Sequence, residues 1–557
     1  GTIKLDGNYP TGTDNVALGD TALDSVEAGG TDNTVIGNHA GTAITTGDHN
    51  TAVGSLSLET NATGSQNVAV GACALNANTG NNNVAVGYQA LDANIGGDSN
   101  VAVGLHALLS NTTGNCNVAV GRKALCSNTT GLTNVAVGLT ALNDNTEGNS
   151  NIAIGCASML DNTTGATNVA VGVATLFDNT TACNNTAVGS YSMIKNTTGT
   201  ANVALGANAL ACNTTADNNI AIGFCSLRLN TTGCRNTALG SCSLNANTTG
   251  TNNVASGFQS MLLNTEGSKN SAYGYSSLGS NTTGSCNTAI GCGSLGGNTT
   301  ADNNTAMGFD SLKANTTGAS NVAVGKNALD ANTSGSNNIA IGEGALGANT
   351  TNTTNLAIGT SALLANNAAG DNLAIGHTAA STNTSGYHLT AVGHYALVAN
   401  ESAQGNTAVG HSALRAATTG ASNTGIGKHA LCKLTTGANN AAVGYAALCT
   451  ATTSYDSVAL GGEALTLTTT GHTNTAIGRQ AMCKNTEGAN NVAVGAFALC
   501  ANTTASDNTA VGKGALLENT TGTRNTAVGK DSLDANTDGN DNTAIGRTSL
   551  SSNTTGD

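Results

Sequence analysis

The most regular feature of this chain is a short apolar–polar phrase that recurs about every seventeen residues. The segment NVAVGRKALCSNTTGLT covers residues 117–133, and the same phrase starts again at Asn134. The glycine that closes NVAVG, called the repeat glycine below, recurs from Gly19 to Gly546 in 32 copies. Such self-similarity predicts a solenoid, because one repeat is too short to bury a core of its own.

The hydrophobic pattern within one copy predicts strands and a turn. NVAVG is short, β-branched and bounded by turn formers, which is typical of a strand. We expect a second short strand over the segment ALxx and a turn at NTTG, where residues 78–80 lack one threonine. Coils stacked about 4.8 Å apart form an all-β parallel β-solenoid. We therefore predict an N-terminal lead-in over residues 1–14 and a solenoid of 32 coils over residues 15–557.

Two aliphatic columns of the repeat are the predicted core. The residue before the repeat glycine is Val, Ile, Leu or Met in 30 copies, and the fourth residue after it is Leu in 26. All five methionines fall in these two columns, and Leu-to-Met exchange conserves core volume. Ser256 and Tyr273 interrupt the first column in adjacent copies, so we expect the large side chain to fill the space that the small one leaves.

Two asparagine columns are predicted to form amide ladders. Asparagine stands four residues before the repeat glycine in 30 copies and seven residues after it in 26. Stacked amides can bond to their copies in the next coil. The second column lapses in four consecutive copies, for which the sequence offers no reason. The repeat glycine itself suits a sharp corner with positive φ or no room for a Cβ.

The alanine two residues before the repeat glycine raises the question of which strand face is inside. Neighbouring strand residues point to opposite faces, and this strand is apolar on both. We expect the aliphatic column to face the coil interior with leucine, and the alanine column to be covered by other chains around a common axis. In the alternative, alanine lines the coil of a monomer and the Val/Thr face is outward.

Composition narrows the classes of function. Only 9% of residues are charged and the net charge is −14, which disfavours a nucleic-acid or anionic-membrane partner. No apolar run is long enough to span a membrane. We find no Ser/His/Asp order or carboxylate pair that stands apart from the repeat, so we predict a non-enzymatic protein without a cofactor.

Three motif-like stretches are better explained by the repeat. GCGSLG at 291–296 and GEGALG at 342–347 match a dinucleotide pattern, and DANTDG at 534–539 matches half of a calcium loop. Each coincides with repeat columns and no flanking helix is predicted, so we assign no site to them.

His377, His394 and His411 follow the repeat glycine directly in three consecutive copies. Stacking would hold their imidazoles about 5 Å apart. This arrangement suits a metal-binding or pH-sensitive patch. The alternative is a ladder of neutral surface histidines, since no carboxylate shares the column.

Cysteine usage predicts reduced thiols. The fifteen cysteines include no C-x-x-C pair, and their odd number resists full pairing. Three pairs share a column in neighbouring copies and are expected to stack as free thiols: Cys225 with Cys242, Cys432 with Cys449, and Cys483 with Cys500.

The phrase NVAVGxxAL…NTTG resembles the shaft repeats of phage tail-fibre proteins. It is also similar to the head repeats of trimeric autotransporter adhesins, and the resemblance covers essentially residues 15–557. The resemblance implies a homotrimeric, non-enzymatic attachment structure of left-handed β-roll type, located on a virion or cell surface. It also implies a receptor or glycan as partner.

Our leading hypothesis is the rigid shaft of an extended attachment fibre. The first alternative is an extracellular filament that stacks end to end, because the last copy is as regular as the middle ones. The second is ice or crystal-face binding by threonine arrays, which the adjacent threonines of NTTG disfavour.

Overall fold

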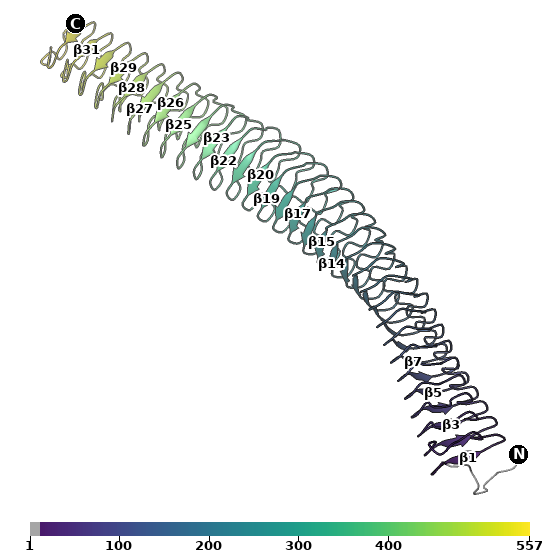
Figure 1. The fold of residues 1–557 in the computed structure, drawn as a ribbon. Helices are drawn as coiled ribbons and strands as arrows, with labels where there is room; N and C mark the ends of the chain where they lie inside the picture. The colour runs from purple at the N-terminus through teal and green to yellow at the C-terminus, as the bar shows by residue number, and fades with distance from the viewer. Residues whose placement is uncertain (1–11) are drawn as a thin grey trace. The chain divides into compact units, whose positions relative to one another are not determined.

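Residues 12–557 of the computed structural model form thirty-two strands of three residues each and no helix, membrane-spanning or otherwise. Each strand is the triplet before a repeat glycine, and turns make up the rest of the coil (Figure 1). Neighbouring strands pair in parallel and in register, so that Ala136 lies beside Ala153. The predicted all-β parallel β-solenoid is confirmed. The predicted lead-in lies mostly outside the described residues.

The coils divide into two compact units, which meet in sequence between Thr283 and Gly284. Each unit contains sixteen strands. The strands of the first unit are β1 (Val16–Leu18), β2 (Thr34–Ile36), β3 (Thr51–Val53), β4 (Val68–Val70), β5 (Val84–Val86), β6 (Val101–Val103), β7 (Val118–Val120), β8 (Val135–Val137), β9 (Ile152–Ile154), β10 (Val169–Val171), β11 (Thr186–Val188), β12 (Val203–Leu205), β13 (Ile220–Ile222), β14 (Thr237–Leu239), β15 (Val254–Ser256) and β16 (Ser271–Tyr273).

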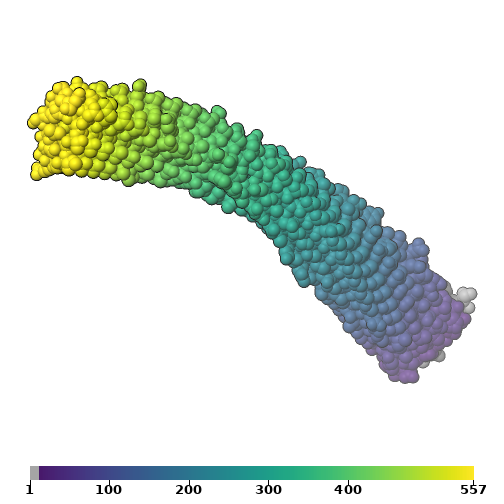
Figure 2. All heavy atoms as spheres, turned by 90° about the horizontal axis from the view of Figure 1, so that it is seen from above, coloured from purple at the N-terminus to yellow at the C-terminus, as the bar shows by residue number. Residues whose placement is uncertain are grey.

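The second unit repeats the arrangement of the first. Its strands are β17 (Thr288–Ile290), β18 (Thr305–Met307), β19 (Val322–Val324), β20 (Ile339–Ile341), β21 (Leu356–Ile358), β22 (Leu373–Ile375), β23 (Thr390–Val392), β24 (Thr407–Val409), β25 (Thr424–Ile426), β26 (Ala441–Val443), β27 (Val458–Leu460), β28 (Thr475–Ile477), β29 (Val492–Val494), β30 (Thr509–Val511), β31 (Thr526–Val528) and β32 (Thr543–Ile545). Within each unit the coils follow one another without a gap on the face seen in Figure 2.

The segment after the repeat glycine is a series of turns, so the predicted second strand is wrong. Lys123 and Leu125 have φ of 56° and 52°, in the left-handed region. A left-handed backbone costs a residue other than glycine about 1–2 kcal/mol. The amides are nevertheless bonded to the adjacent coils: Lys123 donates to Leu105 at 2.9 Å and Leu125 to Ala141 at 2.9 Å. Stacking offsets the local strain, which the sequence of a single repeat does not reveal.

The interior of each coil is lined by alanine, leucine and asparagine. Ala136 on β8 is 0% exposed, as are Ala141 and Leu142 in the same coil. The aliphatic residue before the glycine lies on the opposite side of the strand, and Val120 is 37% exposed. The prediction that the aliphatic column is buried with leucine is therefore wrong, as is the prediction of an outward alanine column. The alternative, in which alanine lines the coil, is correct.

The methionines separate the two columns in the same way. Met159, in the leucine column, is 0% exposed, whereas Met307, in the aliphatic column, is 43% exposed. Tyr273 is also 43% exposed. It projects outward and fills no space beside Ser256, so the predicted compensation between these two residues is wrong. The leucine column supplies one large core side chain in most coils, and a few coils add another from an asparagine column, such as Ile44 and Leu434.

The predicted asparagine ladders are confirmed. In the column seven residues after the glycine, Asn162 Nδ2 donates to Asn145 Oδ1 at 2.7 Å and Asn179 Nδ2 donates to Asn162 Oδ1 at 2.7 Å. Each amide also donates to a carbonyl of its own turn, as Asn162 does to Gly165 at 3.0 Å. In the other column, the backbone amide of the next coil donates to the side-chain oxygen. These side chains are buried, and the ladders supply their hydrogen bonds.

The lapse of the second ladder in the coils of β24–β27 has a physical explanation. Ala417, Leu434, Ala451 and Thr468 replace asparagine there and are fully buried. Where the ladder stops, Asn400 Oδ1 is buried without a partner. Where the ladder resumes, Asn485 Nδ2 donates to Thr468 Oγ1 at 3.4 Å and to Gly488 at 3.1 Å. The interruption therefore leaves an unpaired group only where it begins, and its cost does not grow with every further apolar residue. This favours consecutive lapses over scattered ones.

The repeat glycine is required by both conformation and space, as predicted. Gly138 has a φ of 137°, which side chains rarely allow. A Cβ on Gly138 would lie 2.5 Å from the carbonyl oxygen of Gly155 in the next coil. The glycines therefore stack at a corner with no room for a side chain.

Candidate functional site: the outward strand face

The outward side of the strands is the most extensive candidate surface. We call it the strand face and define it as the side chains three residues and one residue before each repeat glycine. On β7 these are Val118 and Val120, which are half-buried and exposed, respectively. Because the strands are in register, the same two positions repeat along all sixteen strands of each unit. At about 4.8 Å per strand and 3.3 Å per residue, each stripe measures roughly 75 by 7 Å.

The strand face contains no charged residue. Its 64 positions in 32 copies are Val, Ile, Leu, Met, Thr, Ala, Ser or Tyr. At the overall charged fraction of 9%, about six charges would be expected among 64 positions. Partly exposed positions without any charge are unusual for a surface in water, where large apolar patches mark sites of interaction. The strand face is therefore suited to packing against another apolar surface.

Threonines on the strand face do not form a regular hydroxyl array. Threonine occupies the position three residues before the glycine in 13 of 32 copies, and its runs are never longer than three coils. Valine, isoleucine or leucine interrupts these runs, for example at Leu356 and Leu373. A lattice match needs a regular spacing of hydroxyls, so this pattern favours apolar packing over ice or crystal binding.

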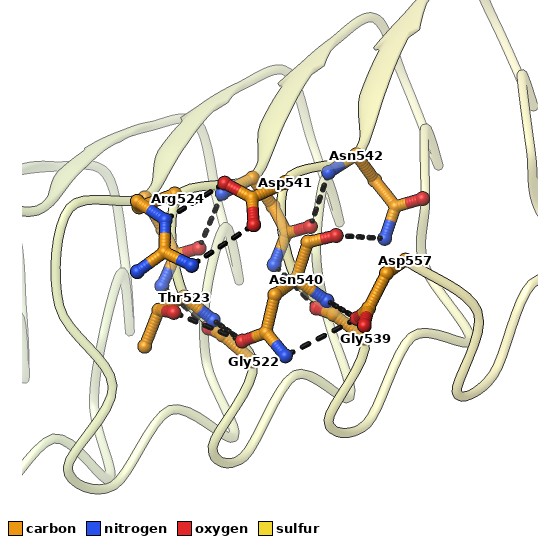
Figure 3. Close-up of polar contacts among 10 residues, drawn as sticks. Gly522, Thr523, Arg524, Gly539, Asn540, Asp541, Asn542 and Asp557 are labelled. Atoms are coloured by element: carbon orange, nitrogen blue, oxygen red, sulfur yellow. Dashed lines mark hydrogen bonds and ion pairs between the residues drawn. The ribbon is translucent and has the colours of Figure 1, made fainter.

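Charged side chains lie on the turns instead. Near the C-terminal end, Arg524 donates from Nε to Asp541 Oδ1 at 2.7 Å and from a terminal guanidinium nitrogen to Oδ2 at 2.9 Å (Figure 3). Asn540 Oδ1 accepts hydrogen bonds from the backbone and hydroxyl of Thr523 at 2.8 and 2.9 Å. The hydrogen bond from Arg524 lowers the pKa of Asp541. Polar ladders of this kind tie successive turns together and leave the strand face apolar.

An acidic ladder lies on another turn column of the first unit. Asp144, Asp161 and Asp178 stand six residues after the repeat glycine in three successive coils. Burial, followed by the charges of Asp178 and Asp144, raises the pKa of Asp161. The folded chain therefore disfavours the negative charge of the middle carboxylate.

The structure brings the three predicted histidines together on the surface of the second unit. His394 Nε2 lies 3.0 Å from His377 Nδ1, and the ring centres of His394 and His411 are 5.5 Å apart. The ladder continues to His429, whose ring centre is 5.6 Å from that of His411. The spacing of the predicted histidine column does not include His429, because His429 lies one position further along the repeat. Tyr395 packs on His394 with ring centres 3.9 Å apart.

The surroundings of the middle histidine, His394, favour its neutral form. Desolvation, followed by the neighbouring charges of His377 and His411, lowers the pKa of His394. Within residues 12–557, no group of three or more His, Cys, Asp or Glu side chains is arranged to hold a metal ion. The metal assignment of the three histidines stays a prediction, and the observed contacts are those of ring stacking and one ring-to-ring hydrogen bond.

The stacked cysteines differ in their surroundings. All fifteen are free thiols in the structure, and the members of the pairs Cys432–Cys449 and Cys483–Cys500 are half-buried. The hydrogen bond from Cys449, together with that from His429 and the charge of Arg415, lowers the pKa of Cys432 to about 5. The hydrogen bond to Cys432 raises the pKa of Cys449.

The dinucleotide-like stretches occupy ordinary turns. Gly344 and Gly347, in GEGALG, line a shallow depression beside Leu364 because they have no side chains. Neither stretch opens a helix in the part of the chain that the structure describes. In nucleotide-binding proteins this motif places a helix N-terminus against the pyrophosphate. Without that helix, the two stretches share only the sequence pattern with a nucleotide site.

Comparison with known proteins identifies no family for this chain. No protein-family model matches this sequence, and no curated protein matches it significantly.

Proposed function

We propose that this chain is the non-enzymatic shaft of an extended attachment fibre on a virion or cell surface, in which copies pack side by side through their strand faces. The uncharged strand face carries this proposal, because it continues over sixteen strands in each unit and remains partly exposed in the single chain. Burial of apolar surface drives association, at roughly 25 cal/mol per Å². A long uncharged stripe with one regular strand spacing can pack along its whole length against a second stripe of the same spacing.

A second copy of this chain is the partner that fits the strand face best. Copies of one chain have stripes of the same spacing, and cyclic packing closes around a common axis. The resemblance to tail-fibre shafts and adhesin heads supports a homotrimer. In this arrangement β-branched and leucine side chains lie at the axis, and the charged turns face solvent, where a receptor or glycan would bind.

The internal bonding of the coils supports a mechanical role. Within each unit, successive coils are hydrogen-bonded to each other through the strand, through the turns and, in most coils, through buried asparagines. Bending or stretching a coil stack would break many of these bonds together. This construction suits load-bearing.

The proposal is tested by placing charges on the strand face of the full chain. Val103, Val120 and Val137 lie on three successive strands and are each replaced by lysine. The wild-type chain is expected to sediment as an oligomer at micromolar concentration and the triple variant as a monomer, because three stacked charges would have to be buried per copy.

A matched control carries the same charges on the turns. Thr113, Thr130 and Thr164 are exposed positions nine residues after their repeat glycines. Their replacement by lysine is expected to leave the sedimenting mass unchanged. A wild-type monomer, or a strand-face variant with the wild-type mass, would overturn the proposal.

A further inference from the structure

One region of the second unit combines a weakened ladder with a pair of thiols. In the coils of β24–β27, alanine, leucine and threonine replace the asparagines that elsewhere bond coil to coil. Cys432 and Cys449 belong to the coils of β25 and β26, in the middle of this gap. They stand five residues after their repeat glycines, only two positions before the lapsed column. The two thiols therefore stand in adjacent coils where the hydrogen bonds between asparagine side chains are absent.

The two thiols are close enough to react with each other. Residues in one column of adjacent in-register coils have Cα atoms about 4.8 Å apart, within the range that a disulfide spans. The backbone confirms the register, since Lys433 donates to the carbonyl of Cys449 at 3.1 Å. The interaction with the Cys449 thiol is also the largest cause of the lowered pKa of Cys432.

The surroundings make the two cysteines chemically unequal. Besides Cys449, the neighbouring His429 and the charge of Arg415, which stands in the same column one coil earlier, lower the pKa of Cys432. These groups and Cys449 hold Cys432 as a thiolate, with a pKa of about 5. Cys449 faces Lys433, but its neighbour Cys432 keeps its pKa raised. Cys432 is the attacking sulfur and Cys449 the resolving one, because the thiolate is the nucleophile in disulfide exchange.

We propose that Cys432 and Cys449 form a redox-responsive staple that closes the gap in the asparagine ladder when the protein meets a low-molecular-weight disulfide. The Cys432 thiolate attacks one sulfur of the small disulfide, which releases one small thiolate and leaves a mixed disulfide on Cys432. The Cys449 thiol then loses its proton to solvent and attacks Cys432 Sγ, which releases the second small thiolate. Two protein thiols are oxidised and one small disulfide is reduced to two thiols.

The pair Cys483–Cys500 is a matched control within the same chain. It occupies the same column in the coils of β28 and β29, where the asparagine ladder has resumed at Asn485. The hydrogen bond from Cys483, with the charge of Lys484, lowers the pKa of Cys500 to about 7, while Glu518 opposes this effect. The control pair has the same spacing without a neighbouring histidine or arginine in its environment.

Peptide mapping distinguishes the two pairs. The full chain is treated with oxidised glutathione between pH 4 and 8, quenched with acid, alkylated and digested with trypsin. Lys433 lies between Cys432 and Cys449, and Lys484 between Cys483 and Cys500, so each disulfide appears as its own linked pair of peptides. We expect the rate of 432–449 linkage to reach half its maximum about two pH units below that of 483–500.

Two variants separate the roles of the sulfurs. Cys449→Ser is expected to accumulate a mixed disulfide with glutathione on Cys432. In Cys432→Ser, modification of Cys449 at pH 6 should be at least tenfold slower than that of Cys432 in Cys449→Ser, because burial still raises the pKa of Cys449. In the oxidised wild type, exchange of backbone amides in the coils of β25 and β26 should slow by on the order of 100-fold, the effect expected for closing a loop of this length.

Three outcomes would overturn the staple. The first is an equal pH midpoint of linkage for the two pairs. The second is modification of Cys449 in Cys432→Ser as fast as that of Cys432 in Cys449→Ser. The third is unchanged amide exchange after complete oxidation. The first two compare cysteines within folded chains of nearly identical sequence, so a general loss of folding cannot produce them.

Discussion

Replacing Asn162 by alanine is expected to destabilise its region of the first unit by about 4 to 6 kcal/mol. The substitution removes two hydrogen bonds that Asn162 donates, to Asn145 and Gly165, and one that it accepts from Asn179. Each bond contributes about 1 kcal/mol net, and the buried Asn145 Oδ1 left without a partner costs a further 1–3 kcal/mol or so. Gly165 and Asn179 keep other partners, so they add no unpaired group.

The double variant Asn145→Ala, Asn162→Ala tests the reasoning more sharply than either single one. It removes the shared hydrogen bond once and leaves one unpaired oxygen, on Asn128, where the two single variants together would leave two. Its cost should therefore fall short of the sum of the single costs by about 2 to 4 kcal/mol. The measurement is amide hydrogen exchange of the coils of β8–β10 in the full chain, which reports local opening free energies.

Asn149→Ala is the control for the ladder variants. Asn149 is exposed on the turns, and its side-chain oxygen accepts a hydrogen bond from the backbone amide of Leu132 at 2.7 Å. Its loss should cost about 1 kcal/mol or less. Additive costs in the double variant would refute the explanation of the ladder and of its four consecutive lapses.

Three further substitutions test individual features of the coil. In a denaturation assay, Gly155→Ala should cost about 3 kcal/mol or more, because Gly155 has a φ of 134° and a Cβ would lie 2.3 Å from the next repeat glycine's carbonyl oxygen. The control Gly96→Ala should be nearly neutral in the same assay, because open space surrounds Gly96. Ala201→Gly should stabilise its coil by about 1 kcal/mol, because Ala201 is exposed with a φ of 55°. The control Ala166→Gly, at a residue with ordinary φ, should destabilise its coil by about 0.5–1 kcal/mol. If hydrogen exchange shows that both substitutions change stability in the same direction, the left-handed geometry is contradicted. Asp161→Asn should stabilise the folded chain by about 0.5 kcal/mol or less at pH 7, since the raised pKa of Asp161 means that folding favours the protonated acid. This gain in stability should fade as the pH falls through that pKa. A gain that persists at pH 3 would exclude charge as its cause.

The repeat period and the turn-rich composition were enough to predict the solenoid. The register followed from the strict spacing, and the asparagine ladders followed from the stacking of identical amides. The second strand was predicted wrongly because its residues, such as Leu125, adopt a left-handed backbone that leucine avoids in isolation. Hydrogen bonds to the coils above and below hold that backbone, and these are properties of the stack.

The orientation of the strand could not be decided from local hydrophobicity. Valine is more apolar than alanine, which favoured burying the aliphatic column. The interior, however, holds a leucine and two asparagines per coil in most copies, and only alanine fits beside them at the strand. The absence of charge in the aliphatic column was visible in the sequence, and it indicates an interaction face as well as a core. The histidine column was found by its spacing, but His429, the fourth ring, depended on the path of the turn.

Electron cryomicroscopy of the assembled wild-type chain tests the central claim most directly. We expect a cross-section with several copies around an axis, the strand faces of adjacent copies in contact, and the alanine and leucine columns enclosed within each coil. Single chains with solvent-exposed strand faces, or copies that touch through their charged turns, would contradict the account.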